Sequence, residues 1–183
     1  MDCYTSEETL PAITLGELLD ALDGLDTVSE PRGIPFPQAN SLDRVIDLCI
    51  SLDFRNSDKD RIAEDYKFVD RQADYYSRAA EYLGLVRRTA DKEVELADPG
   101  IDFLELRNSE ATLYLTKLIL CHAPFRESFD VLLETGEMPS ADLVAEIIRE
   151  NTWYTGSTHR RRASTVISWL RWIWSHVDRC YAV

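Results

Sequence analysis

The chain is poor in positive charge. It contains 20 lysine and arginine residues against 33 aspartate and glutamate residues, so its net charge at pH 7 is −13. A protein that binds nucleic acid needs cations for the phosphates, and the overall charge argues against such a partner unless the cations are concentrated. Residues 1–150 carry a net charge of −17, whereas residues 151–183 carry +4. The C-terminal segment is therefore the one basic part of an acidic chain.

Other absences exclude further classes of protein. No apolar run approaches the roughly 20 residues of a membrane span, and the start of the chain is acidic where a signal peptide would be basic, so we expect a cytoplasmic protein without membrane contact. The four cysteines, Cys3, Cys49, Cys121 and Cys180, include no CxxC pair, which argues against a zinc site. No glycine-rich phosphate loop is present, and we expect neither a cofactor nor a metal.

Arginine outnumbers lysine by 16 to 4, and acidic residues are spread along most of the chain. This composition resembles that of proteins from salt-loving archaea, whose acidic surfaces keep them soluble at high ionic strength. Salt at that level screens the attraction between a protein and phosphate. A halophilic protein that binds DNA would therefore depend more on base contacts and on DNA shape.

The basic segment also has a strongly apolar side. At about 100° per residue, a helix over residues 157–177 places Ala163, Val166, Leu170, Ile173 and Val177 on one side. Its arginines lie on the other side, where the first helical turn disfavours cations but suits contact with phosphate. The pattern has two interpretations that the sequence leaves open. It predicts either a recognition helix that enters nucleic acid by its N-terminal end or a core helix with solvated arginines.

The rest of the chain divides into an arm and two helical units. Residues 1–40 predict an N-terminal arm, with a short amphipathic helix over residues 14–25 and an extended proline-rich linker over residues 31–38. Such an arm packs on its own chain, on a second copy or on a partner protein. The first unit, residues 41–106, reads as helices over residues 41–54, 58–66 and 70–83, followed by a β-hairpin over residues 85–96.

Three helices and a hairpin are typical of a winged helix. The second unit, residues 107–183, shows helical apolar spacing over residues 109–120, 125–135, 141–150 and 157–177. Its last two helices are separated by a polar turn that contains Gly156, which is the form of a helix-turn-helix. We therefore expect a mainly α fold of tandem winged-helix or helix-turn-helix units with a small β-hairpin wing.

Two stretches of the first unit are distinctive: RQADYYSRAAEYLGLV, residues 71–86, and the wing VELADPG, residues 94–100. They resemble the winged-helix modules of prokaryotic proteins associated with restriction and mobile-element defence. Val94 stands where an aromatic residue is common in these modules, and Ala97 stands where threonine is common. The likeness continues through FRESFDVLLETGEMPS, residues 125–140, and residues 157–173, so it covers about residues 41–174. It implies a module that binds DNA, alone or attached to a nuclease or ATPase.

The function expected from these patterns is non-enzymatic binding of double-stranded DNA. The protein would act as a transcription regulator or as the recognition component of a defence or restriction system. The residues expected to contact DNA lie on the last helix, on residues 70–83 and on the wing: Thr158, His159, Arg160, Arg161, Ser164, Thr165, Ser168, Arg171, Arg71, Tyr75, Arg78, Arg87, Arg88 and Lys92.

The main alternative is a protein–protein interaction adaptor. Winged helices often keep their fold after losing DNA contacts, and here Asp70 and Asp74 stand beside Arg71 and Arg78. A small helical ribonuclease is a further alternative, suggested by Arg171 and His176.

Five residues on a helix rotate by about 140°, so the side chains of Arg171 and His176 do not readily converge. Cys121 and His122 are adjacent but lack a third group that would orient a base. These patterns do not predict an enzyme.

Overall fold

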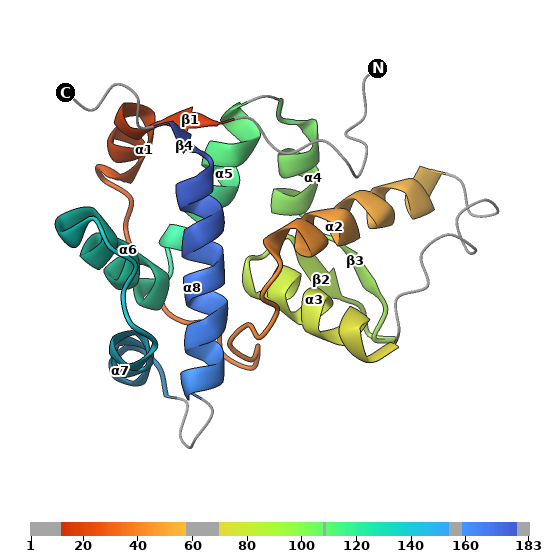
Figure 1. Cartoon of the computed structure of the whole chain (residues 1–183). Helices are drawn as coiled ribbons and strands as arrows, with labels where there is room; N and C mark the ends of the chain where they lie inside the picture. The colour runs from red at the N-terminus through yellow and green to blue at the C-terminus, as the bar shows by residue number, and fades with distance from the viewer. Residues whose placement is uncertain (1–11, 58–69, 108, 154–158, 179–183) are drawn as a thin grey trace.

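The structure, a computed structural model, describes residues 12–57, 70–107, 109–153 and 159–178. Over these ranges the chain is mainly helical, with two small sheets, which confirms the expected mainly α character (Figure 1). Within the same ranges, no helix has both the length and the apolar character that a membrane crossing requires. The elements are β1 (Ile13–Thr14), α1 (Leu15–Leu22), α2 (Leu42–Ser57), α3 (Asp70–Tyr82), β2 (Val86–Arg88), β3 (Val94–Leu96), α4 (Asp98–Glu105), α5 (Ser109–Leu120), α6 (Ala123–Thr135), α7 (Ala141–Asn151), α8 (His159–Ser175) and β4 (Val177–Asp178).

The N-terminal helix packs on its own chain. Helix α1 begins with the expected capping box, in which the Thr14 hydroxyl accepts from the Glu17 backbone N–H at 3.1 Å and the Glu17 carboxylate accepts from the Thr14 backbone N–H at 2.8 Å. Leu18 and Leu22 are buried, and α1 contacts α5. Strand β1 pairs in parallel with β4 at the other end of the described chain. The amphipathic helix is therefore confirmed, although it ends at Leu22 rather than at residue 25 and leaves Leu19 exposed.

The expected β-hairpin is also confirmed. Helix α3 ends at Tyr82, and the chain turns at Gly84. The φ of Gly84 is 74°, a left-handed conformation that glycine adopts at little energetic cost. Strands β2 and β3 then pair antiparallel, with Val86 opposite Leu96, and β2 packs against α3. A tight contact follows at Gly100, where a Cβ atom would collide with the carbonyl oxygen of Leu85. The start of α4 is thus pressed against the base of the hairpin.

Two parts of the first unit differ from expectation. Helix α2 continues to Ser57, so the break expected at residues 55–57 is wrong; the helix expected over residues 58–66 lies outside the described residues. Helix α4 was not expected, because the sequence DPG that opens it reads as a turn. Pro99 stands in the first turn of α4, where a proline costs no hydrogen bond. Whether α2, α3 and the hairpin form a winged helix stays a prediction.

The helices of the second unit begin and end close to the expected positions. Helix α6 starts two residues early, at Ala123, with a proline in its first turn, and it ends at Gly136, which has a left-handed φ of 72°. The Ser140 hydroxyl caps α7 by accepting from the Leu143 backbone N–H at 3.2 Å. Local signals of apolar spacing, proline and glycine therefore suffice to place these helices.

A single hydrophobic cluster runs through the described chain, from Ile13 to Val177. An aromatic stack lies within it: the Phe36 and Phe125 rings are 5.6 Å apart, and the Phe125 and Trp169 rings are 5.1 Å apart. Phe36 comes from the proline-rich segment, which contains no helix; it was expected to be an extended linker, but it turns at residues 32–34 and packs Phe36 into the core. The division into an arm and two units stays a prediction, since all three supply side chains to this cluster.

Candidate nucleic-acid interface on helix α8

Helix α8 carries an exposed polar side with no acidic residue. At 100° per residue, its outward residues fall within an arc of about 100°. We call this set the α8 stripe; it consists of Arg160, Arg161, Ser164, Ser168, Arg171 and Ser175. All of these residues are exposed except Ser168, which is half-buried, and the helix sequence from His159 to Ser175 contains no aspartate or glutamate. The outward placement of the arginines that the helical wheel selected is confirmed.

The inward side of α8 holds the helix on the body of the protein. Val166, Leu170 and Ile173 are each fully buried, as expected from the wheel. The helix packs most extensively against α7, and it also contacts α6 and β4. In Figure 1, α8 runs through the centre of the view with α6 and α7 beside it, while α3 and the β2–β3 hairpin lie on the other side. The stripe therefore rests on a well-packed support.

The segment formed by residues 36–43 lies along one flank of α8. Its hydrogen bonds to the helix reach from the first turn of α8 almost to the last; they join Arg161 Nε to Gln38 Oε1 (3.1 Å), Asn40 Nδ2 to Ser164 Oγ (3.2 Å), Thr165 Oγ1 to Asn40 Oδ1 (2.9 Å), Trp169 Nε1 to the Ala39 carbonyl (2.8 Å) and Trp172 Nε1 to Asp43 Oδ1 (2.7 Å).

The bonded positions extend along most of the helix. Gln38 binds α8 near its start, at Arg161, and Asp43, in the first turn of α2, binds it near its C-terminal end, at Trp172. The 36–43 segment therefore lies alongside α8.

The three arginines of the stripe differ in their partners. Arg160 forms an ion pair with Asp142 of α7, with Nε and Nη2 at 3.0 and 2.7 Å from Oδ1. Arg161 donates to the neutral amide oxygen of Gln38, and no carboxylate of the described residues pairs with it. Within the described ranges, Arg171 is exposed and makes no hydrogen bond or ion pair. Two of the three guanidinium charges are therefore uncompensated by a contacting acid.

Not every residue expected on this surface is available. Thr165 is fully buried, and its hydroxyl donates to Asn40; the expectation that it contacts DNA is wrong, because the 36–43 segment covers this flank of the helix. Ser164 is exposed, although its hydroxyl already accepts from Asn40. His159 is half-buried, with Nδ1 enclosed. Thr158 lies outside the described residues.

The arginines of the first unit form a network of ion pairs with acids. Arg88 lies 3.2 Å from both Asp74 and Glu81, and Arg78 lies 3.6 and 3.3 Å from the same two carboxylates. The network joins α3 to β2. These two arginines are thus neutralised within the fold, although the sequence predicts them as DNA contacts.

The wing shows the same pairing. Arg87 lies 2.7 Å from Glu95 on the opposite strand, and this hydrogen bond raises the pKa of Arg87 above its ordinary value. Lys92 is exposed in the turn with a φ of 66°, and Tyr75 on α3 is 37% exposed. The side chain of Arg71 is outside the described part of the structure. Among the wing cations, Lys92 is the one that remains exposed without a carboxylate partner in the described residues.

A buried polar cluster surrounds His122, which seemed to lack a partner in the sequence. The Tyr82 hydroxyl lies 3.0 and 2.8 Å from the two carboxylate oxygens of Glu30. The His122 ring stacks on Tyr82 at 4.2 Å, and its Nδ1 lies 3.4 Å from Glu30 Oε1, an ion-pair distance without a hydrogen bond. All three residues are less than 10% exposed. This cluster joins the segment before α2 to α3 and to the start of α6, and its three side chains are buried within the described part of the chain.

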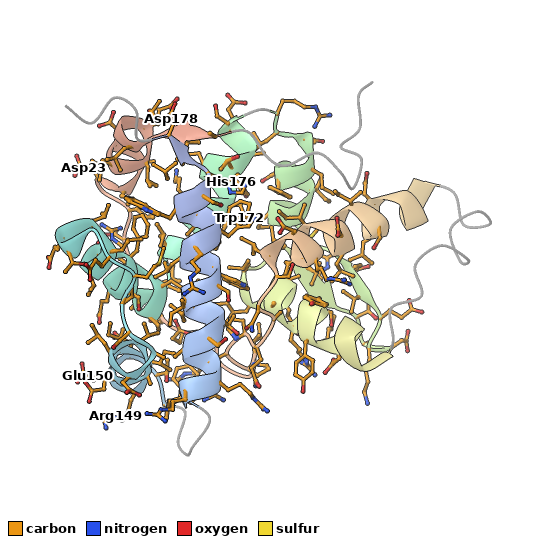
Figure 2. All side chains as sticks on the ribbon, in the orientation of Figure 1. Asp23, Arg149, Glu150, Trp172, His176 and Asp178 are labelled. Atoms are coloured by element: carbon orange, nitrogen blue, oxygen red, sulfur yellow. The ribbon has the colours of Figure 1, made fainter. Side chains whose placement is uncertain are left out.

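The pattern suggestive of a ribonuclease is not assembled. The His176 ring stacks on Trp172 at 4.1 Å, and its Nδ1 lies 2.8 Å from the Trp172 carbonyl oxygen. Figure 2 shows both residues at the C-terminal end of α8. No contact brings His176 to Arg171 in the described part of the chain. Across the same part, no three His, Cys, Asp or Glu side chains come together as a metal site would require.

The residues missed by the sequence are the partners of the arginines. Gln38, Asn40 and Asp142 belong to no sequence motif, and only the fold brings them to α8.

Burial raises the pKa of the Cys49 thiol to about 12 and also raises that of Cys121, so neither thiol is an activated nucleophile.

Comparison with known proteins places the chain by family alone. No curated protein and no solved structure matches it. One protein family matches residues 44–178, a range that contains α3, the β2–β3 hairpin and the whole of α8. The chain therefore belongs to the family described as Domain of unknown function (DUF7226).

Proposed function

We propose that the protein binds double-stranded DNA through the α8 stripe and does so without catalysing a reaction. The observation that carries the proposal is the contrast between the stripe and the rest of the chain. The net charge is −13, yet an arc of about 100° on α8 presents arginines and serines with no acid among them. A surface of this kind attracts phosphate even on an acidic protein, because local charge governs a close contact.

The spacing of the two uncompensated arginines suits a duplex. Arg161 and Arg171 are ten residues apart, which corresponds to about 15 Å along the helix axis. The major groove of DNA is about 12 Å wide. If α8 lies across that groove, the two guanidinium groups reach phosphates on its opposite sides. Between them, Ser164 and Ser168 face the groove with small side chains that permit a close approach.

The first unit contributes less to this surface than the sequence suggests. For Arg78, Arg87 or Arg88 to bind phosphate, each must first leave a carboxylate within 3.6 Å. The resemblance to winged-helix modules of restriction and defence proteins supports a role as a transcription regulator or as the recognition component of such a system. In that role α8, rather than α3 and the wing, makes the principal contact.

The test is a titration of a labelled random duplex, followed by fluorescence anisotropy from 0.1 to 1 M KCl. Each phosphate contact contributes about 0.9 to the slope of log affinity against log salt. Replacing both Arg161 and Arg171 with alanine should lower the slope by about 1.8. Because both side chains are exposed, each substitution should change the free energy of unfolding by only about 0.5 kcal/mol.

The matched control removes two exposed cations that lie outside the stripe, Lys117 of α5 and Arg107 between α4 and α5. It changes the net charge by the same amount and should leave the salt slope close to that of the wild type. The proposal fails if the wild type does not bind the duplex. It also fails if the control lowers the slope as much as the variant of the stripe does.

A second candidate function, a protein–protein adaptor, is favoured by the paired charges on α3 and the wing. It is also favoured by an open groove of about 450 Å³ between the end of α1 and α6, whose lining combines Leu19, Leu22, Leu25 and Leu133 with the charged residues Asp23, Asp26, Arg126 and Asp130. Leu19 is 45% exposed there. A second copy or a partner protein would cover this mixed apolar and charged lining. Sedimentation of the wild type and of Leu19→Asp tests the homodimer: a dimer that the substitution dissociates supports it, and a monomeric wild type removes it.

A further inference from the structure

The first turn of α8 presents two adjacent arginines whose partners differ in kind. Arg160 is held by the carboxylate of Asp142, whereas Arg161 is held by the amide of Gln38. A carboxylate orients a guanidinium and also cancels its charge. An amide oxygen orients the group and leaves the full charge available to a ligand.

We propose that Gln38 is the positioning residue for Arg161 in phosphate binding, an inference that rests on the proposed function. The bond at 3.1 Å uses Arg161 Nε alone, and the four N–H groups of Nη1 and Nη2 have no partner among the described residues. Such N–H groups can donate two parallel hydrogen bonds to a phosphate, the bidentate geometry typical of arginine. A free arginine loses rotamer freedom when it binds, and a side chain already held in place loses less.

Gln38 is itself fixed in place. Phe36, two residues before it, is 1% exposed within the aromatic stack. Ala39, the next residue, accepts the Trp169 indole N–H at 2.8 Å, and Asn40 is bonded to α8 on both atoms of its amide. The backbone on both sides of Gln38 is therefore anchored to the core and to the helix. The backbone that carries Gln38 is thereby held beside Arg161.

Two substitutions separate charge from orientation. Gln38→Glu places a carboxylate against Arg161, so the salt slope of duplex binding should fall by about 0.9, to the value of Arg161→Ala. Combining Gln38→Glu with Arg161→Ala should produce no further fall. Gln38→Met keeps the length of the side chain and the charge of Arg161 but removes the acceptor. It should leave the slope unchanged and weaken binding about two- to fivefold, the effect of one modest hydrogen bond.

Asn40→Asp is the control for added charge. It introduces the same negative charge two residues away, against the hydroxyl groups of Ser164 and Thr165 rather than the guanidinium. An equal loss of slope in Asn40→Asp and Gln38→Glu overturns the inference, because the effect would then be general. Wild-type affinity in Gln38→Met overturns it as well. If the wild type binds no duplex, the proposed function and this inference fail together. If the wild type binds and the variant of Arg161 and Arg171 loses salt slope, but the Gln38 variants keep the slope and affinity of the wild type, this inference fails alone.

Discussion

Replacing Asp142 with asparagine should strengthen DNA binding. The carboxylate of Asp142 holds Arg160 at 2.7 Å, and both side chains are largely exposed, at 73% and 78%. Asparagine has nearly the same shape but no charge. The substitution would return Arg160 to the α8 stripe as a third uncompensated cation, beside Arg161 and Arg171.

The cost to stability should be small. An exposed ion pair contributes about 0.2 to 1 kcal/mol. Asp142 also stands in the first turn of α7, where an acid contributes about 0.3 to 1 kcal/mol through the helix dipole. The free energy of unfolding should therefore fall by at most about 2 kcal/mol. Because native proteins are stable by about 5 to 15 kcal/mol, Asp142→Asn should remain folded in buffer without denaturant.

The gain should appear in the salt dependence. One further phosphate contact steepens the slope by about 0.9, so the advantage of Asp142→Asn over the wild type should shrink about eightfold between 0.1 and 1 M KCl. The matched control is Asp130→Asn, which removes a carboxylate lying 3.2 Å from Arg126 on α6, away from the stripe. Fluorescence anisotropy on one labelled duplex measures all three proteins. An unchanged slope in Asp142→Asn, or an equal change in Asp130→Asn, would refute the reasoning.

Three predictions concern buried side chains. Leu170→Ala should lower the free energy of unfolding by about 2 to 5 kcal/mol in urea, because the side chain is fully buried; a loss below 1 kcal/mol would contradict that packing. Tyr82→Phe removes the hydroxyl that the buried Glu30 carboxylate accepts from, and the same assay should show a loss of about 1 to 3 kcal/mol, whereas an unchanged midpoint would argue against the cluster. The Cys49 thiol, with its pKa raised to about 12, stays protonated below that pH, so iodoacetamide at pH 8 should label it only after unfolding; labelling in the native protein would count against its burial.

Much of the helical framework is predictable because its signals are local. Apolar spacing, Pro124 and Gly136 mark α6 almost completely, and Ser140 marks the start of α7. Helix α4 could not be predicted because its first residues, Asp98, Pro99 and Gly100, are also typical of turns. The helix is stabilised by packing against the base of the hairpin, which the sequence does not show. The β1–β4 pair could not be predicted for a different reason. Two residues are too few to show the alternation of apolar and polar side chains that identifies a strand, and the two strands meet only when opposite ends of the described chain come together.

The candidate site was predictable as a helix face but not as a set of partners. The helical wheel places Arg160 and Arg161 outward without any knowledge of the fold. Their partners Asp142 and Gln38 lie 18 and 123 positions away in the sequence, where no spacing rule applies. Thr165 sits at the boundary of the polar arc, and only the presence of the 36–43 segment decides that it is covered. The wing arginines look available in sequence because the acids that neutralise them come from α3 and the opposite strand.

The pairing of the 36–43 segment with α8 has a consequence for the order in which the protein is made. Gln38 leaves the ribosome about 120 residues before Arg161, and Ile13 long before its partner Val177. Contacts between such distant positions form late, since a long loop must close before they contribute. Helices α5 to α7 can assemble while synthesis continues. The flank of α8 that holds Arg161 can be completed only when the last helix emerges, so an interrupted chain should carry no finished binding surface.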